Sequence, residues 1–235
     1  MPRAMKIEPS VSLVLMCKRP RLHQGKQRLA AVIGPTLTLS IAEGLLECTL
    51  EDAKQWPGPV VIAISHTRDL IWAQNIIPTA EVIYQGEGNL GQRINHIDST
   101  LRACGHQKLV FIGTDAPMLT NAFYQGVQPC LEKADVVLTQ AEDGGVVMMA
   151  CNHAWPELTK LPWSTENLAA HLASLCVNHG MRLHYHQHGY DIDEFSNLAR
   201  LSQDLMSDKR PARQHLLMRL NACLDELEGK KLCMT

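Results

Sequence analysis

The sequence has 235 residues, of which 46% are hydrophobic and 20% are charged, and its formal net charge is -2 at neutral pH. This composition excludes an intrinsically disordered chain and offers no basic surface for a polyanion, so we expect no nucleic-acid partner. The length allows one domain with a sizeable core, which is typical of a soluble globular enzyme or binding protein.

Apolar segments of strand length recur along the chain, and helical patterns separate them. The expected strands span residues 11–17, 60–65, 82–85, 109–113, 136–139 and 146–150. Apolar residues at helical spacing predict helices over residues 36–54, 67–76, 90–104, 120–132, 165–178 and 195–206. Strands with almost no polar interruption are typical of a sheet covered on both faces. The alternation predicts an α/β fold with a mostly parallel sheet.

The composition changes after Ser207, where apolar residues again follow a helical spacing. We therefore expect one main domain over residues 1–207 and a C-terminal helical extension over residues 208–235. This helix would pack either on the domain or on a partner chain. If the partner is a second copy of this chain, the helix would form a homo-oligomer.

Eight cysteines are scattered singly, and no two have the C-x-x-C spacing of zinc or redox sites. They are typical of buried thiols in a reducing compartment. The sequence contains no apolar run of the length that a membrane-spanning helix needs, and the apolar run near its start has no cleavage site. We expect a cytoplasmic protein with no membrane span.

Polar motifs follow several of the predicted strands. A basic loop with a single glycine comes after the first strand and contains Lys18, Arg19, Arg21, Lys26 and Arg28. Side-chain charge would bind a diphosphate or triphosphate there, although an ordinary solvated basic loop would look the same. The segment "GEGNLGQRI" at residues 86–94 places glycines before a helix start, where a phosphate or ribose can bind. A plain strand-to-helix turn explains it equally well.

Three aspartate motifs lie at later strand ends. Asp115 follows the strand expected at residues 109–113 and would project into the crevice at the carboxyl edge of the sheet, as a ligand of Mg²⁺ or Mn²⁺ or as a simple turn cap. Asp143 precedes two glycines in a tight turn. Asp191 and Asp193 face the same side of an extended segment, and either of them would be a second metal ligand unless this is only a solvated acidic turn.

The segment "LHYHQH" predicts that His184, His186 and His188 lie on one face of a strand. Three imidazoles on one side are able to bind a transition metal, and a polar strand face is the alternative interpretation.

Six motifs occur in one order along the chain, and together they are more specific than any one of them. They are "KxRL" from Lys26, "LGQR" at 90–93, "GTDAP" at 113–117, "EDGG" at 142–145, "WST" at 163–165 and "DID" at 191–193. Over about residues 10–205 the chain resembles the bacterial DUF2064 family, a branch of the glycosyltransferase A (GT-A) superfamily. The resemblance implies a Rossmann-like three-layer α/β/α architecture, the nucleotide-diphospho-sugar transferase fold. It also implies a nucleotide-diphosphate sugar as donor and a divalent metal held by aspartates.

The resemblance assigns roles to matched positions. Asp115 and Asp193 would hold Mg²⁺ or Mn²⁺, and Asp115, Asp143 and Arg28 form the expected catalytic set. The expected nucleotide-binding residues are Lys18, Lys26, Arg28, Gly91, Arg93 and Thr114. The expected acceptor or sugar side consists of Gly144, Gly145, Trp163, Ser164 and Thr165. Trp163 would stack on a sugar or base face, or would be a core tryptophan ahead of a helix cap.

The chain departs from the family pattern at three places. Leu22-His23 replaces the usual Pro-Gly before the basic motif, Val146-Val147 replaces an aromatic pair, and Glu194 replaces a threonine.

The first hypothesis is a metal-dependent glycosyltransferase that uses a nucleotide-diphosphate sugar and a small-molecule acceptor, with Asp143 as the base if the reaction inverts. The second is a nucleotidyltransferase similar to guanylyltransferases, which uses a nucleoside triphosphate and releases pyrophosphate. The third is a non-catalytic nucleotide-sugar binder or an assembly subunit.

Overall fold

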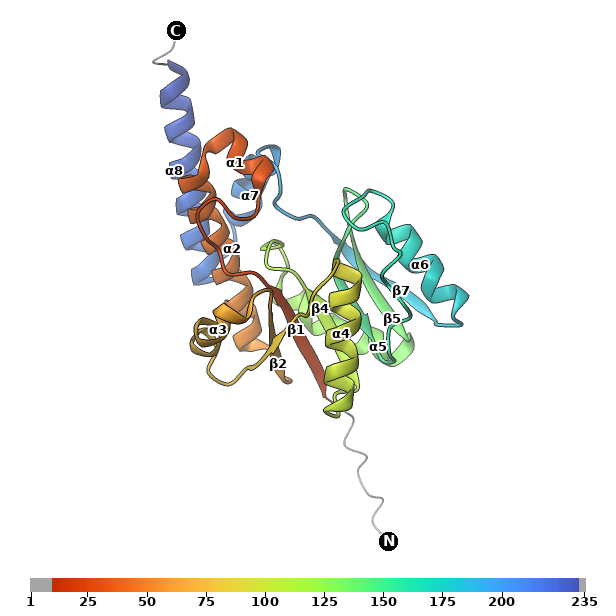
Figure 1. Cartoon of the computed structure of the whole chain (residues 1–235). Helices are drawn as coiled ribbons and strands as arrows, with labels where there is room; N and C mark the ends of the chain where they lie inside the picture. Colours follow the sequence, from red (N-terminus) through yellow and green to blue (C-terminus); the bar gives the residue numbers. More distant parts are fainter. Residues whose placement is uncertain (1–9, 233–235) are drawn as a thin grey trace.

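The computed structural model describes residues 10–232, with side chains up to Leu227. The elements are β1 (Val11–Cys17), α1 (Gln27–Ile33), α2 (Pro35–Gln55), β2 (Val60–Ile64), η1 (Thr67–Asp69), α3 (Leu70–Ile76), β3 (Glu81–Tyr84) and α4 (Leu90–Ala103). They continue with β4 (Lys108–Ile112), α5 (Asn121–Lys133), β5 (Val136–Ala141), β6 (Val146–Cys151), α6 (Leu168–Asn178), β7 (Leu183–Gly189), α7 (Ser196–Leu205) and α8 (Pro211–Leu232). Figure 1 shows their arrangement.

The strands form one seven-stranded sheet in the order β3-β2-β1-β4-β6-β5-β7. All neighbouring strands are parallel except β6, which runs antiparallel to both β4 and β5. The predicted α/β fold with a mostly parallel sheet is therefore confirmed. The single reversal arises because residues 142–145 form a short hairpin connection, and such a connection joins antiparallel strands.

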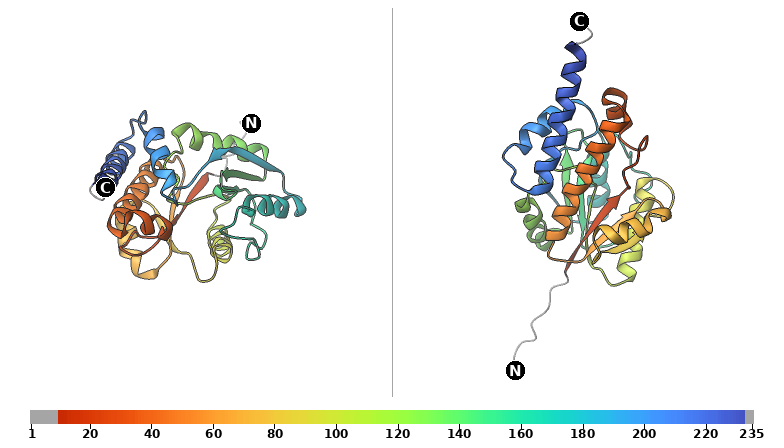
Figure 2. Two further views of the ribbon diagram at one scale, coloured as in Figure 1. Left: turned by 90° about the horizontal axis from the view of Figure 1, so that it is seen from above. Right: turned by 90° about the vertical axis from the view of Figure 1, so that its left-hand side faces the viewer.

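Helices cover both faces of the sheet, as the uninterrupted apolar strands predict. Residues of α2, α3 and α5 pack on one face, where Leu15, Ile62 and Val110 belong to the core. Residues of α4 and α6 pack on the other face, with Val14, Leu109 and Leu138. Seen from above in Figure 2, α4 and α5 lie on opposite sides of the sheet.

A third apolar cluster joins α1, α2, α7 and α8 beside the sheet. In both Figure 1 and Figure 2, α8 runs along α2. Gly44 of α2 permits this close approach, since a Cβ atom there would lie 2.9 Å from Leu216 of α8. Within residues 10–232, no helix is both long and apolar enough to cross a bilayer.

Two local signals in the sequence have clear structural counterparts. Gly34 precedes α2 with Pro35 at its first turn, where the missing N–H of proline costs nothing. The Thr120 side chain accepts a hydrogen bond from the backbone N–H of Phe123 and so caps α5.

Candidate functional site

A cavity of about 480 Å³ opens at the carboxyl edge of the parallel strands, which is the place where open α/β sheets bind ligands. Its volume is within the range of small-molecule sites. Its polar lining is Lys18, Ser65, Gln85, Arg93, Thr114, Asp115, Ser164 and Asp191, and its apolar lining includes Met16, Leu90, Phe111, Val146, Val147 and Trp163. The cavity therefore joins segments that follow β1, β2, β3, β4 and β7.

Both predicted metal ligands approach the same lysine beside this cavity, which Asp115 lines. The Nζ atom of Lys26 lies 3.6 Å from Asp115 Oδ2 and 3.8 Å from Asp193 Oδ1. The backbone N–H of Ile192 donates to the carbonyl of Asp115, which fastens the segment after β7 to the loop after β4. Lys26 directly precedes α1. Its backbone has φ 45° and ψ 46°, which is the left-handed region that residues other than glycine rarely adopt. Strain of this kind is typical of functional positions.

Asp191 lies beside the same group of carboxylates and lines the cavity. Burial first, and then the negative charges of Asp115, Asp143 and Asp193, raise the pKa of the Asp191 carboxyl to about 6. Lys26 is the only cationic side chain paired with Asp115 or Asp193 among the described residues. The rim therefore carries excess negative charge, and a bound cation would offset it.

The chemistry of these side chains fits a hard cation that arrives with phosphate. Among the residues described, no three His, Cys, Asp or Glu side chains come together as a metal cage. Mg²⁺ needs no such cage, because it usually takes one or two carboxylates and completes its shell with substrate phosphates and water. Asp115 and Asp193 are able to supply those two carboxylates.

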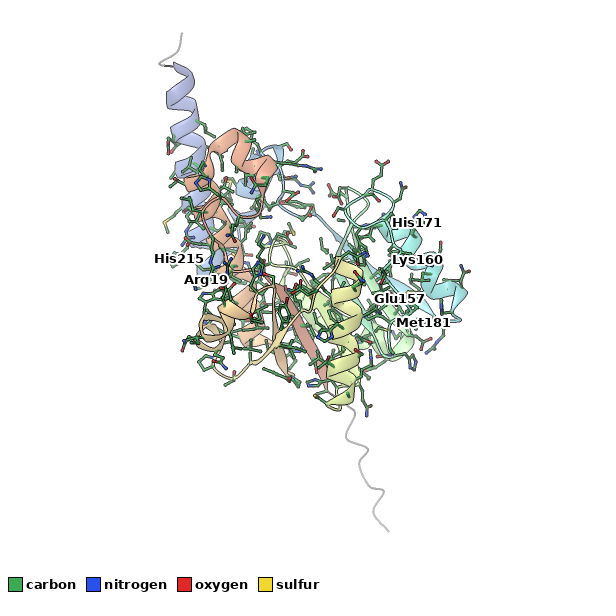
Figure 3. All side chains as sticks on the ribbon, viewed as in Figure 1. Arg19, Glu157, Lys160, His171, Met181 and His215 are labelled. Atoms are coloured by element: carbon green, nitrogen blue, oxygen red, sulfur yellow. The ribbon has the colours of Figure 1, made fainter. Side chains whose placement is uncertain are left out.

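Most of the basic loop has protein partners. The guanidinium of Arg19 lies 5.4 Å from the ring centroid of Trp72 in α3, and Figure 3 places Arg19 on that side of the molecule. Arg21 pairs with the buried Asp69 at 2.5 Å. Arg28 pairs with Glu194 at 3.3 Å, and both side chains are exposed. Lys18 lines the cavity and forms no ion pair with any described residue, so within this loop it is the cation that remains for an anionic ligand.

The start of α4 contributes Arg93 to the cavity but turns Gly91 away from it. Asn89 caps α4 in a reciprocal capping box with Gln92. Arg93 donates to the Gly88 carbonyl at 3.0 Å and to Gln85 Oε1 at 3.4 Å, which holds its guanidinium at the cavity wall. A Cβ atom on Gly91 would lie 2.3 Å from the carbonyl oxygen of Leu158, so Gly91 allows α4 to pack on this loop.

Part of the predicted acceptor side also forms the cavity wall. Trp163 lines the cavity, and its Nε1–H donates to the Leu158 carbonyl at 2.9 Å, which fixes the orientation of the ring. Ser164 also lines the cavity and has φ 63°. Thr165 is exposed and donates to the Pro162 carbonyl. It does not line the cavity.

The hairpin at residues 142–145 supports this wall without lining the cavity. Gly144 has φ 85°, and its carbonyl accepts a hydrogen bond from Ala169 N at the start of α6. Asp143 Oδ1 accepts from the backbone N–H of Gly145 at 2.9 Å, so this carboxylate stabilises the turn. Its charge nevertheless contributes to the raised pKa of Asp191.

Two polar residues of the cavity, Ser65 and Gln85, were not predicted from the sequence. Ser65 follows β2, and its Oγ atom is buried with no hydrogen-bond partner among the described residues. Such an unpaired hydroxyl is costly unless a ligand or water binds it. Gln85 follows β3, is buried, and donates to the Ala63 carbonyl at 2.7 Å. The signal that would have found both is their position directly after a buried parallel strand.

The predicted row of three histidines on one strand face is wrong. Tyr185 pairs with Leu138 and His188 pairs with Gln140, so β7 contains one residue more than β5 over this interval. This bulge at Gln187, which has φ 55°, breaks the alternation that a common face requires.

The three histidine side chains also differ in their surroundings. His186 is buried and its Nε2 atom lies 2.9 Å from the Phe123 carbonyl oxygen. His184 and His188 are exposed. No metal cluster forms here among the described residues.

The sheet order and the cavity at its carboxyl edge define a nucleotide-diphospho-sugar transferase-like fold. The family described as "Uncharacterized protein conserved in bacteria (DUF2064)" matches residues 49–165, and the chain belongs to this family. No match was found among curated proteins.

Solved structures show the same fold. One is a candidate nucleotide-diphospho-sugar transferase from Desulfovibrio desulfuricans G20, with a TM-score of 0.82 and 15% identity over 92% of this chain and 97% of that chain. Another is Rv0371c from Mycobacterium tuberculosis H37Rv in complex with manganese, with a TM-score of 0.51 and 13% identity over 82% of this chain and 97% of that one. A third is 4-diphosphocytidyl-2C-methyl-D-erythritol synthase from Anaerococcus prevotii DSM 20548, with a TM-score of 0.50 and 13% identity over 80% and 94%. At these identities the likeness concerns the fold alone.

Proposed function

We propose that this protein is a metal-dependent glycosyltransferase that uses a nucleotide-diphosphate sugar as donor and a small molecule as acceptor. The observation that carries the proposal is the approach of Asp115 and Asp193 to Lys26 at the rim of the cavity. Lys18 and Arg93 line the same cavity and supply positive charge for a diphosphate.

Mg²⁺ or Mn²⁺, when bound with the diphosphate, would neutralise the charge of the leaving group as the bond between the sugar C1 and the phosphate oxygen breaks. Asp115 and Asp193 would hold this ion. Lys26 orients the two carboxylates before the ion binds, and Lys18 stabilises the diphosphate charge as it develops. The fixed ring of Trp163 offers a surface on which a sugar or base stacks.

Asp143 is the proposed base for the acceptor hydroxyl if the reaction inverts. Its carboxylate is bound to the Gly145 N–H, so one oxygen atom is held and the other is available to accept a proton. Arg28 would contact phosphate only after it leaves Glu194.

A second candidate is a nucleotidyltransferase, in which an oxygen of the acceptor attacks the α-phosphate of a nucleoside triphosphate and pyrophosphate leaves. It is supported by the fold shared with 4-diphosphocytidyl-2C-methyl-D-erythritol synthase and with a CMP:2-keto-3-deoxy-manno-octonic acid synthetase complexed with CTP. Lys18 at the end of β1 is able to serve a triphosphate as well as a diphosphate. A cytoplasmic location and a homo-oligomer formed through α8 remain predictions.

Product analysis separates these candidates. The wild-type protein and the Asp115→Asn variant are incubated with Mn²⁺ and either nucleotide-diphosphate sugars or nucleoside triphosphates with sugar phosphates. Metal-dependent release of nucleoside diphosphate that the variant lacks supports the glycosyltransferase. Release of pyrophosphate supports the second candidate instead. Ligand binding without any turnover would overturn both and leave a nucleotide-sugar binder.

A further inference from the structure

The C-terminal helix α8 inserts a fully buried arginine between α2 and the loop that carries Asp115. Arg213 has no exposed surface. It donates to Asp52 Oδ2 at 2.5 Å and to the Cys48 carbonyl at 2.6 Å, both on α2. Its Nε–H donates to the Pro117 carbonyl at 3.1 Å, two residues after Asp115. One side chain therefore connects α8, α2 and the loop after β4.

A second arginine of the same segment holds the next part of this loop. Arg210 donates to the Leu119 carbonyl at 2.9 Å and to Asp52 Oδ1 at 2.8 Å. The carbonyls of Pro117 and Leu119 therefore accept hydrogen bonds from Arg213 and Arg210, which belong to the C-terminal segment beside the sheet. On the other side of the loop, the Asp115 carbonyl accepts from Ile192 N, next to Asp193.

Stability alone is a weak explanation for this arrangement. A buried ion pair pays a large desolvation penalty, and apolar replacements of similar volume are often neutral or stabilising. What apolar side chains cannot provide is a set of directed donors to backbone carbonyls. The guanidinium group has five N–H donors in a rigid fork, which suits it to fix several acceptors at once.

We propose that Arg213 is a positioning residue that holds the Asp115 loop in the orientation where Asp115 and Asp193 converge on Lys26. The consequence for metal and phosphate binding rests on the proposed function. The effect on the loop itself does not, and the two are measured separately.

The chain offers a matched control on the same helix. Arg219 of α8 also binds α2, since it donates to the Ser40 carbonyl and to Glu47 Oε1, both at 2.8 Å. Among the described residues, Arg219 forms no hydrogen bond or ion pair with the Asp115 loop. Arg213→Lys keeps the charge beside Asp52 but removes the separate Nε–H donor that binds the Pro117 carbonyl. Arg219→Lys makes the same chemical change without touching the loop.

Amide hydrogen exchange of the ligand-free variants tests the loop directly. We expect faster exchange in residues 113–119 and 190–193 for Arg213→Lys than for Arg219→Lys. Arg210→Gln removes the donor to Leu119 and should give a smaller increase in the same segments, and it serves as the second variant if Arg213→Lys does not fold. Equal exchange in these segments for the Arg219→Lys control and every folded variant would overturn the proposal.

Titration calorimetry with Mn²⁺ and pyrophosphate tests the consequence at the rim. We expect Arg213→Lys to weaken binding by about tenfold, as the loss of a group that orients a metal ligand usually does, and Arg219→Lys to bind as the wild type does. If the wild type itself binds no Mn²⁺ with pyrophosphate, the proposed function fails while the exchange data still decide the role of Arg213. Unchanged affinity in Arg213→Lys together with faster exchange would restrict its role to the loop and overturn its role at the rim.

Discussion

The Nζ atom of Lys26 lies 3.6 Å from Oδ2 of Asp115, although 89 positions separate them in the sequence, from 26 to 115. Asparagine at position 115 would keep the size of the side chain and remove its charge, so it would no longer be a good ligand for a hard cation. We expect Asp115→Asn to abolish the Mn²⁺-dependent part of the thermal shift that a nucleotide diphosphate produces.

The stabilisation expected in this thermal-shift experiment is calculable, and the chain offers a matched control variant. A ligand at about 100 times its Kd stabilises the native state by about 2.7 kcal/mol, which is easily measured as a higher Tm. Asp225→Asn makes the same change at an exposed position on α8 and should leave the shift intact. A full Mn²⁺-dependent shift in Asp115→Asn would exclude Asp115 as a metal ligand.

Arg28 pairs with Glu194, which is one of the places where the chain departs from the family pattern. Glu194 stands where threonine is usual, and its carboxylate lies 3.3 Å from the Arg28 guanidinium. An exposed pair of this kind contributes about 0.2–1 kcal/mol. We therefore expect Glu194→Thr to release Arg28 and to strengthen pyrophosphate binding by about twofold to fivefold at low salt, measured by calorimetry. If Glu132→Thr, an exposed control on α5, gives the same gain, the pairing is irrelevant to binding.

A second departure from the family pattern coincides with an unusual backbone conformation. His23 replaces the glycine of a Pro-Gly pair and has φ 62°, in the left-handed region that glycine adopts freely. We expect His23→Gly to raise the free energy of unfolding by about 0.5–1 kcal/mol, because it removes strain that exceeds the entropy lost by glycine.

Urea denaturation tests this expectation against His66→Gly. His66 is exposed with φ -144°, where a side chain is unstrained, so glycine should only destabilise there. The prediction fails if both variants lose stability.

The sequence predicted the strands within a residue or two because their apolar runs are buried on both faces. The span 109–113 was expected, and β4 is Lys108–Ile112. The helix α1 was not predicted, because its seven residues start at the end of the basic stretch and follow the left-handed Lys26, which provides no capping side chain. The basic residues just before α1 obscured the helical spacing of its two buried apolar residues, Leu29 and Ile33.

The candidate site was predictable only as far as strand ends determine it. Lys18, Thr114 and Asp115 line the cavity because each follows a strand of the parallel sheet. The pairing of Arg28 with Glu194 joins residues 166 positions apart, and no local pattern contains it. The packing of Gly91 on Leu158 is likewise a long-range contact, although its sequence pattern resembles that of a ligand-binding glycine.

Asp191 makes the stability of the ligand-free protein depend on pH. Its pKa is raised to about 6, first by burial and then by the neighbouring aspartates. The folded state therefore holds this proton more tightly than the unfolded chain does between about pH 4 and pH 6, so this group lowers stability as pH rises through that window. Solvent screening reduces the full linkage, and we expect Asp191→Asn to gain about 1 kcal/mol above pH 6.

Thermal denaturation at about pH 4 and above pH 7 measures this gain. The amide and the protonated acid are both neutral at the lower pH, so the two proteins should then have similar Tm values. Comparing the variant with the wild type at each pH cancels the other titrating groups. An equal difference in Tm at both pH values would contradict a titration of Asp191 in this range.

Gly144 allows two backbones to approach so closely that no side chain fits between them. It has φ +85°, and a Cβ atom there would lie 1.8 Å from the Glu166 carbonyl oxygen. Gly105 has φ +98° with nothing within 4 Å of its Cβ position. Alanine at either site should cost about 1–2 kcal/mol for the left-handed backbone.

Only Gly144→Ala must also displace the 163–168 segment, and this separates its effect from that of Gly105→Ala. We therefore expect a larger loss of stability in urea for Gly144→Ala. Since Trp163 and Ser164 belong to the displaced segment and line the cavity, we also expect weaker binding of nucleotide sugars in this variant alone. Equal losses of stability in the two variants would mean that the segment yields without cost, and the wall beside Trp163 would then be adaptable rather than fixed by the hairpin.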